Sequence, residues 1–322
     1  MRSWRLLTTG VIVLALLVGG AYYAVQHGIG PLPDPKHCLA KVDGYTVEMS
    51  TEQAENASII SAVAERRGLP ARAISIAIAT AYQESKLRNL DSGDRDSVGL
   101  FQQRPSQGWG TVKQIKDPYY AANAFYDALV KIDGYQYMEI TKAAQEVQRS
   151  AFPNAYADHE RDGRAIASAM AGYSPAAFSC STDAVDLASQ KITGSGLTPR
   201  AEAVRADIRK AFGDLPMGGF EPGGVTTGHM AGSAHYEGRA VDVFFRPVNA
   251  DNIRRGWVLA HYLVANASRL KIANVIFDAK IWSAGSKSAD GWRAYDPNLN
   301  GNESAATKAI LLHRDHVHVD VG

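Results

Sequence analysis

Two short segments in the last third of the chain carry residue types that bind metals. His235 and Asp242 lie seven residues apart, and Gly238 relaxes the turn that would bring them together. The terminal segment HVHVDV places His316 and His318 on one face, because side chains alternate along a strand. Two histidines, one aspartate and an open fourth position are typical of a catalytic zinc site. The sequence therefore predicts a zinc site here.

A second candidate is Glu84, at the end of the apolar segment 70–86. Apolar surroundings disfavour the charged form of a carboxyl group, so such a residue can act as a general acid. The turn that follows holds Asp91, Asp94 and Asp96. Asp94 or Asp96 is a candidate second acid, and a solvated Asp-rich turn is the simpler interpretation of both.

The segment around Glu84 is predicted to be helical. Ser50 and Gln53 form a capping-box pattern, and Gly68 ends the helix that they begin. Further helix starts are predicted at Pro70, Asp117, Thr141 and Pro153. Residues 50–178 are therefore predicted to form an all-α domain.

The pattern changes after a polar linker over residues 179–197. A helix is predicted from Thr198 to Gly213, and another over residues 249–270. Strands are predicted over 240–245 and 274–277 and in the terminal HVHVDV segment. Residues 198–322 are therefore predicted to form an α+β domain with a small antiparallel sheet.

The N-terminus suggests export. Residues 1–5 contain two arginines, and residues 6–25 are apolar and uncharged, long enough to span a bilayer as a helix. The basic flank predicts a cytoplasmic tail, a single-pass transmembrane anchor and both domains outside the cytoplasm. A cleaved signal peptide is the alternative, and it would make the protein secreted. Residues 26–49 are interpreted as a spacer.

The cysteine content and the charge limit the function classes. Outside the cytoplasm two thiols tend to pair, so Cys38 and Cys180 are predicted to form a disulfide that ties together the ends of the first domain. Lys plus Arg is 34 and Asp plus Glu is 33, a net charge of +1. This balance excludes a chain-wide electrostatic grip on nucleic acid.

The motif AYQES followed by SVGLFQQRP resembles the lysozyme-like lytic transglycosylases, in an exported actinobacterial-type branch. The resemblance covers roughly residues 50–175. It implies cleavage of the peptidoglycan glycan strand, with Glu84 as general acid and base and with Gln102 and Gln103 as sugar-binding amides. The family's usual Tyr-Asn-Ala-Gly segment is absent. Candidates to close the cleft instead are Gln145, Gln148 and Tyr156. A transglycosylase and a muramidase, which hydrolyses the strand, both remain open.

The pattern S-x-H-x-x-G-x-A-x-D and the closing HRDHVHVDV resemble the zinc peptidases of the lysostaphin, D-alanyl-D-alanine and hedgehog group. The resemblance implies His235, Asp242 and His318 as zinc ligands, Asp315 or His316 as the base, and the peptidoglycan stem peptide as substrate. The segment with which these enzymes grip the substrate carboxylate is replaced by a glycine-rich stretch. His229 and Arg239 are possible substitutes.

Both resemblances imply the same substrate polymer, peptidoglycan. We therefore expect a membrane-anchored enzyme that remodels peptidoglycan through its glycan strand and its stem peptide. The alternative from another class is a cell-wall-binding scaffold whose zinc-binding domain does not turn over substrate.

Overall fold

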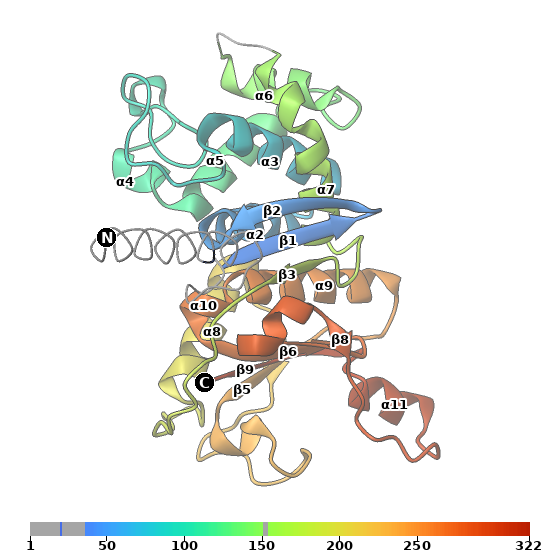
Figure 1. Ribbon diagram of the computed structural model, residues 1–322. Coiled ribbons are helices and arrows are strands. Elements are labelled where there is room, and N and C mark those ends of the chain that lie inside the picture. Colours follow the sequence, from blue (N-terminus) through green and yellow to red (C-terminus); the bar gives the residue numbers. More distant parts are fainter. Residues whose placement is uncertain (1–19, 21–35, 151–153) are drawn as a thin grey trace, which may run out of the picture. The chain divides into compact units, whose positions relative to one another are not determined.

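The computed structural model describes residue 20 and residues 36–150 and 154–322. Residues 37–322 form one compact unit (Figure 1). The predicted cytoplasmic tail and membrane anchor lie, apart from Gly20, outside the described residues. Among the residues that are described, no helix combines the length and the apolar character needed to cross a bilayer.

The helical region, residues 37–180, combines a small sheet with helices. The three strands β1 (His37–Val42), β2 (Tyr45–Ser50) and β3 (Phe178–Cys180) are antiparallel, in the order β2-β1-β3. The helices are α2 (Thr51–Arg66), α3 (Ala71–Ser85), α4 (Val112–Ile115), α5 (Pro118–Leu129), α6 (Ile140–Gln148) and α7 (Glu160–Met170), with 3-10 turns η1 (Pro105–Gln107) and η2 (Ala155–His159).

The predicted fold class was wrong, because the described chain is mixed α/β and its first part is not an all-α lysozyme-like domain. Residues 37–49, interpreted as spacer, form most of a β-hairpin. Asp43 and Gly44 have positive φ angles of 49° and 76°, as a tight hairpin turn requires. Cys38, Ala40 and Val47 are buried among more exposed neighbours, the alternation of a half-buried strand.

The helices of this region begin and end at identifiable signals. Ser50 and Gln53 form the predicted capping box of α2. The α5 helix starts at Pro118, where the side chain of Asp117 accepts a hydrogen bond from the backbone N–H of Tyr119. The α3 helix is buried along most of its length, so it fixes the position of the Glu84 backbone in its last turn.

The sheet region, residues 198–322, is built on a six-stranded antiparallel sheet in the order β4-β5-β9-β6-β7-β8. The strands are β4 (Met217–Gly218), β5 (Ala240–Phe244), β6 (Ile272–Phe277), β7 (Lys280–Ser283), β8 (Arg293–Ala294) and β9 (His316–Val321). The helices are α8 (Pro199–Phe212), α9 (Ala250–Ala265), α10 (Ala267–Leu270) and α11 (Ala305–Leu311), with 3-10 turns η3 (Ala234–Glu237) and η4 (Gly285–Asp290). The strands β5, β6 and β9 occupy segments predicted as strands.

Helix α9 joins the two regions, because it contacts α2 and α7 as well as β6 and β9 (Figure 1). The guanidinium of Arg254 on α9 binds both carboxylate oxygens of Glu65 on α2, at 2.9 and 3.2 Å. His261 is fully buried and donates from Nδ1 to the carbonyl of Ala169 on α7. The indoles of Trp282 and Trp292 donate to carbonyls of β3.

The predicted disulfide between Cys38 and Cys180 is confirmed. The two cysteines face each other across β1 and β3, and they are 142 residues apart in the chain. The bond therefore closes nearly the whole helical region into one covalent loop.

Candidate metal centre

Two neighbouring strands of the six-stranded sheet position the metal-binding side chains. Asp242 on β5 lies directly opposite His318 on β9 in the antiparallel register. Opposite residues of an antiparallel pair have their side chains on the same face. His235 reaches the same place from η3, which ends at Gly238 in a left-handed conformation (φ 65°). Strand register and one tight turn thus bring three predicted ligands together.

The three side chains approach one another closely. The Nε2 atom of His235 lies 3.0 Å from Nδ1 of His318 and 3.2 Å from Oδ1 of Asp242. The Nδ1 atom of His318 lies 3.0 Å from the same carboxylate oxygen. Tetrahedral zinc ligands at about 2.0–2.1 Å from the ion stand about 3.3 Å from one another. Both the donor types and the spacing therefore fit zinc.

Outer partners hold both imidazoles in place. The Nδ1–H of His235 donates to the carbonyl oxygen of Gly219 at 2.7 Å. The Nε2–H of His318 donates to Asp320 at 3.3 Å, and Asp320 also accepts from the amide of Asn274. Such partners orient metal-binding imidazoles and select their tautomers. A Cβ atom at Gly219 would lie only 2.3 Å from the His235 ring, so only glycine allows this approach.

Burial and hydrogen bonding shift the pKa values of Asp242 and His318 in opposite directions. Burial opposes ionisation of Asp242, but the hydrogen bonds from His235 and His318 hold its pKa below its ordinary value. Burial also lowers the pKa of His318, but hydrogen bonds to Asp242 and Asp320 outweigh it and raise that pKa to about 9. The ionised carboxylate of Asp242 thus lies against the imidazole of His318, whose protonated form it favours.

His316 and Asp315 lie beside the three ligands. The Nδ1 atom of His316 is 2.7 Å from Oδ1 of Asp315, and its Nε2 atom is 3.9 Å from Oδ1 of Asp242. The guanidinium of Arg246 binds the other oxygen of Asp315 at 2.7 Å. Burial opposes ionisation of Asp315, but the contacts with His316 and Arg246 lower its pKa. Of the two predicted bases, His316 is the one that faces the ligands, and Asp315 stands behind it.

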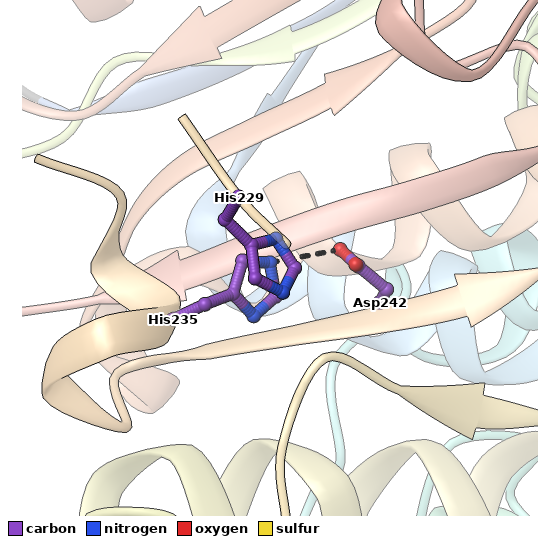
Figure 2. Close-up of side chains that lie close together, drawn as sticks. All are labelled: His229, His235 and Asp242. Atoms are coloured by element: carbon purple, nitrogen blue, oxygen red, sulfur yellow. Dashed lines mark ion pairs between the residues drawn. The ribbon is translucent and has the colours of Figure 1, made fainter. Parts of the chain in front are cut away.

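His229 belongs to the cluster, although the sequence suggested it only as a substrate contact. Its ring stacks on that of His235, with centroids 4.0 Å apart and planes 20° apart. Figure 2 shows the two rings face to face beside the Asp242 carboxylate. One ligand atom from each of the three residues lies within 4.8 Å of the other two. No fixed spacing relates a histidine in a glycine-rich loop to the strands, so the sequence carried no signal for this contact.

The cluster opens into a pocket of about 550 Å³. Its wall includes the loop around His229, the strands β5 and β9, and the segment that ends α11. Tyr295 and His313 also line it, and the pKa of His313 falls to about 3 because the side chain is buried and lies near His316 and His318. Arg239 lines the pocket as well, but its guanidinium binds Glu237 and the carbonyl of Val321. The pocket is large enough for a peptide segment.

Glu84 sits in a simpler setting on the last turn of α3. The hydroxyl of Tyr156 on η2 donates to Oε1 of Glu84 at 2.7 Å. Burial and the negative charge of Glu84 raise the pKa of Tyr156. Gln145 donates to the carbonyl of Ser150 and Gln148 to that of Phe101, so Tyr156 is the one of the three cleft candidates that contacts Glu84 among the described residues.

The two glutamines predicted to bind sugar make local contacts. Gln103 is buried and donates to the carbonyl of Ala121 on α5. Gln102 donates to the carbonyl of Gly99 and accepts from the hydroxyl of Ser97. These bonds hold the segment after α3 together, and Gln102 is the more accessible of the pair.

The aspartates after Glu84 are held by partners of their own. The backbone N–H of Ser106 and the guanidinium of Arg104 bind Asp96 and keep its pKa well below its ordinary value. Asp91 pairs with Lys116, which lowers the pKa of Asp91, and Asp94 is almost fully exposed. A bound, ionised Asp96 on a surface loop matches the solvated-turn interpretation better than a second catalytic acid.

One family model matches part of the chain. Residues 193–306 are similar to the family described as "VldE, C-terminal domain". The match covers about a third of the chain, including His229, His235 and Asp242 but not His316 or His318. Among curated proteins, no match is found.

Proposed function

We propose that the sheet region is a zinc-dependent peptidase that acts on the peptide part of peptidoglycan. The observation that supports this most is the mutual spacing of 3.0–3.2 Å among the ligand atoms of His235, Asp242 and His318. Three protein ligands beside a pocket of about 550 Å³ resemble a catalytic zinc site more than a structural one. The peptide substrate comes from the sequence resemblance, not from the geometry.

His235, Asp242 and His318 would hold the zinc. When bound, zinc polarises the carbonyl of the scissile amide and lowers the pKa of a water molecule. The chain's own contribution to proton transfer is His316, whose Nε2 faces the cluster and accepts the proton of the attacking water. Its Nδ1–H is held by Asp315, which Arg246 fixes in turn. A base oriented by a carboxylate is a recurrent arrangement in hydrolases.

A second candidate activity, glycan cleavage by Glu84, is supported by one contact. The Tyr156 hydroxyl binds Glu84 from a segment about seventy residues downstream, so the carboxyl group is oriented and not merely a helix end. Glu84 would protonate the oxygen that leaves the sugar ring. Whether the strand is cut by a transglycosylase or a hydrolase is read from the product, an anhydro end or a reducing end.

The place of action that we propose is outside the cytoplasm. The disulfide between Cys38 and Cys180 supports it, because such bonds persist in oxidising compartments. The rival proposal is a cell-wall scaffold that binds zinc without turnover.

The test is metal analysis combined with peptide hydrolysis. Wild-type protein is expected to bind about one zinc per chain and to cleave isolated stem peptides. The His318→Ala variant is expected to lose both properties, whereas His159→Ala, the same change far from the sheet, retains both. Zinc-loaded wild-type protein that leaves every stem peptide intact would favour the scaffold.

A further inference from the structure

Two arginines line the pocket of the metal site, and they differ in how much of each guanidinium the protein itself binds. The Arg239 side chain is 14% exposed, and it donates to Glu237 and to the carbonyl of Val321. The Arg246 side chain is 54% exposed, and its Nε and Nη2 atoms each lie 2.7 Å from the same oxygen, Oδ2 of Asp315. Because a guanidinium has five N–H donors and Asp315 takes two, the edge formed by Nη1 and Nη2 keeps donors for a second acceptor.

The guanidinium of Arg246 is held in one orientation. Its Cζ atom lies 4.2 Å from the centroid of the Phe244 ring, which belongs to the last residue of β5. The carboxylate of Asp315 holds one edge of the guanidinium and is itself bonded through its other oxygen to Nδ1 of His316. A planar fork that is fixed before a ligand arrives loses little conformational freedom when the ligand binds.

The chemical group that this edge fits best is a carboxylate. Its two oxygens accept from two parallel N–H groups of an arginine. Two other carboxylates on the pocket wall have partners of their own, since Asp242 is bonded to His318 and Asp320 to Asn274. A second acceptor for Arg246 would therefore come from a molecule bound in the pocket.

We propose that Arg246 binds a carboxylate group of the peptide substrate and so makes the site selective for peptides with a negative charge close to the scissile bond. This rests on the proposed function, because it takes the sheet region to be the peptidase. Asp315 links Arg246 to His316, so the bound carboxylate would lie only two side chains away from the base. An extended peptide advances about 3.3–3.6 Å per residue, so this carboxylate belongs to a residue near the cut. It is either the C-terminus of the peptide or an acidic side chain.

The inference is tested with pairs of stem peptides that differ only in an amide that replaces a carboxylate. One pair differs at the C-terminus and the other at an acidic side chain. For the zinc-loaded full chain, kcat/KM is expected to be about 10–100-fold higher for the acid than for the amide in one pair, the usual effect of hydrogen bonds to a charged group. The pair that shows this preference identifies the carboxylate. Arg246→Gln is expected to abolish the preference, and Arg246→Lys, which keeps the charge but not the fork, to retain part of it.

Two further variants separate substrate binding from the support of the base. Arg246 also holds Asp315, so its variants are expected to cleave both members of a pair more slowly, and the preference is a ratio measured within one protein. Asp315→Asn is expected to slow the cleavage of both members and to keep the preference. Arg239→Gln, the same change at the other arginine of the pocket, is the matched control and is expected to keep the preference as well.

Binding of the same peptides in the presence of a chelator distinguishes this inference from the proposed function. Fluorescence anisotropy of labelled peptides is expected to show that the acid binds more tightly to wild-type protein than to Arg246→Gln. Such binding without any hydrolysis in zinc would overturn the peptidase and leave Arg246 as a carboxylate site. Peptide cleavage with equal kcat/KM within each pair, or a preference that survives Arg246→Gln, would overturn the role of Arg246 and leave the peptidase standing. Protein that neither binds nor cleaves the peptides would overturn both.

Discussion

The sheet region and the helical region place their chemical groups in opposite ways. In the sheet region Asp242 and His318 face each other across adjacent strands, and each is bonded to the other and to further groups. In the helical region Glu84 is a half-buried carboxyl group on the last turn of a helix, oriented by the hydroxyl of Tyr156. Strand register fixes a cluster from several directions at once, whereas a helix end offers one residue and depends on another segment to orient it.

The difference also appears in the surrounding electrostatics. The buried carboxylate of Asp242 lies against His235 and His318, and a bound metal ion would supply a positive counter-charge there. The acidic groups near Glu84 are instead neutralised by Arg104 and Lys116 at the surface. We therefore expect the sheet region to respond to chelators and the helical region to be indifferent to them.

The largest effect is expected from Asp242→Ala. Removing the carboxylate leaves His235 and His318 without their shared partner, and metal binding and peptide cleavage should fall to background. Glycan cleavage should remain, because the Glu84 site shares no residue with the cluster. Metal content and the two product classes, measured on the same samples, check both statements. A variant that loses both activities while staying folded would contradict the separation of the two sites.

Glu84→Gln is expected to lower the rate of glycan cleavage about 10²–10⁴-fold, which is the usual contribution of a general acid. Peptide cleavage should continue. Tyr156→Phe, which removes only the orienting hydroxyl, should reduce glycan cleavage less. The rate at which muropeptides are released from purified sacculi measures glycan cleavage by the wild-type protein and by both variants. Wild-type rates in a folded Glu84→Gln protein would remove Glu84 from the mechanism.

Loss of the disulfide should destabilise the helical region without touching either candidate site. The Cys38→Ser, Cys180→Ser double variant is expected to lose about 2–5 kcal/mol of unfolding free energy. Denaturant titration measures this, and wild-type protein in strong reductant should behave like the variant. Equal stability of the oxidised and reduced proteins would show that packing of β1 against β3 is sufficient.

The smallest effect is expected at the junction of the two regions. Burial lowers the pKa of His261 to about 4, compared with 6.5 for the free side chain. The neutral form is favoured in the folded state, so its stabilising contribution is complete above pH 6.5 and is lost progressively as the pH falls from 6.5 to 4. Between pH 7 and 5, wild-type protein should lose up to about 2 kcal/mol more unfolding free energy than His261→Gln. If the unfolding free energies of the wild-type and His261→Gln proteins changed equally with pH, the imidazole of His261 would not be buried in its neutral form.

The convergence of the predicted zinc ligands could be anticipated because strands have a fixed period. Alternation in HVHVDV put His316 and His318 on one face, and the turn at Gly238 allowed His235 to approach Asp242. The position of His229 could not be anticipated, since it depends on Tyr236 clamping a loop with no periodic structure. Neither could the arrangement of Asp315 behind His316 be anticipated, since it depends on Arg246, which binds the other carboxylate oxygen of Asp315.

The error in the fold class has a local cause. The Asp43-Gly44 pair between alternating buried residues is a hairpin signal, but the glycines and prolines before it suggested a continuous spacer. The partner strand β3 lies more than 130 residues downstream, and short windows of sequence contain no signal for such a distant pairing. The capping box of α2 was predictable because both of its residues lie within four positions.

The most direct test of the zinc peptidase is mass spectrometry of peptidoglycan digested by the full chain, with and without a zinc chelator. We expect stem-peptide cleavage that disappears in chelator and returns when zinc is added, together with glycan products that persist in both conditions. Peptide cleavage that continues at the same rate in chelator, with zinc shown to be absent from the protein, would contradict the metal site at His235, Asp242 and His318.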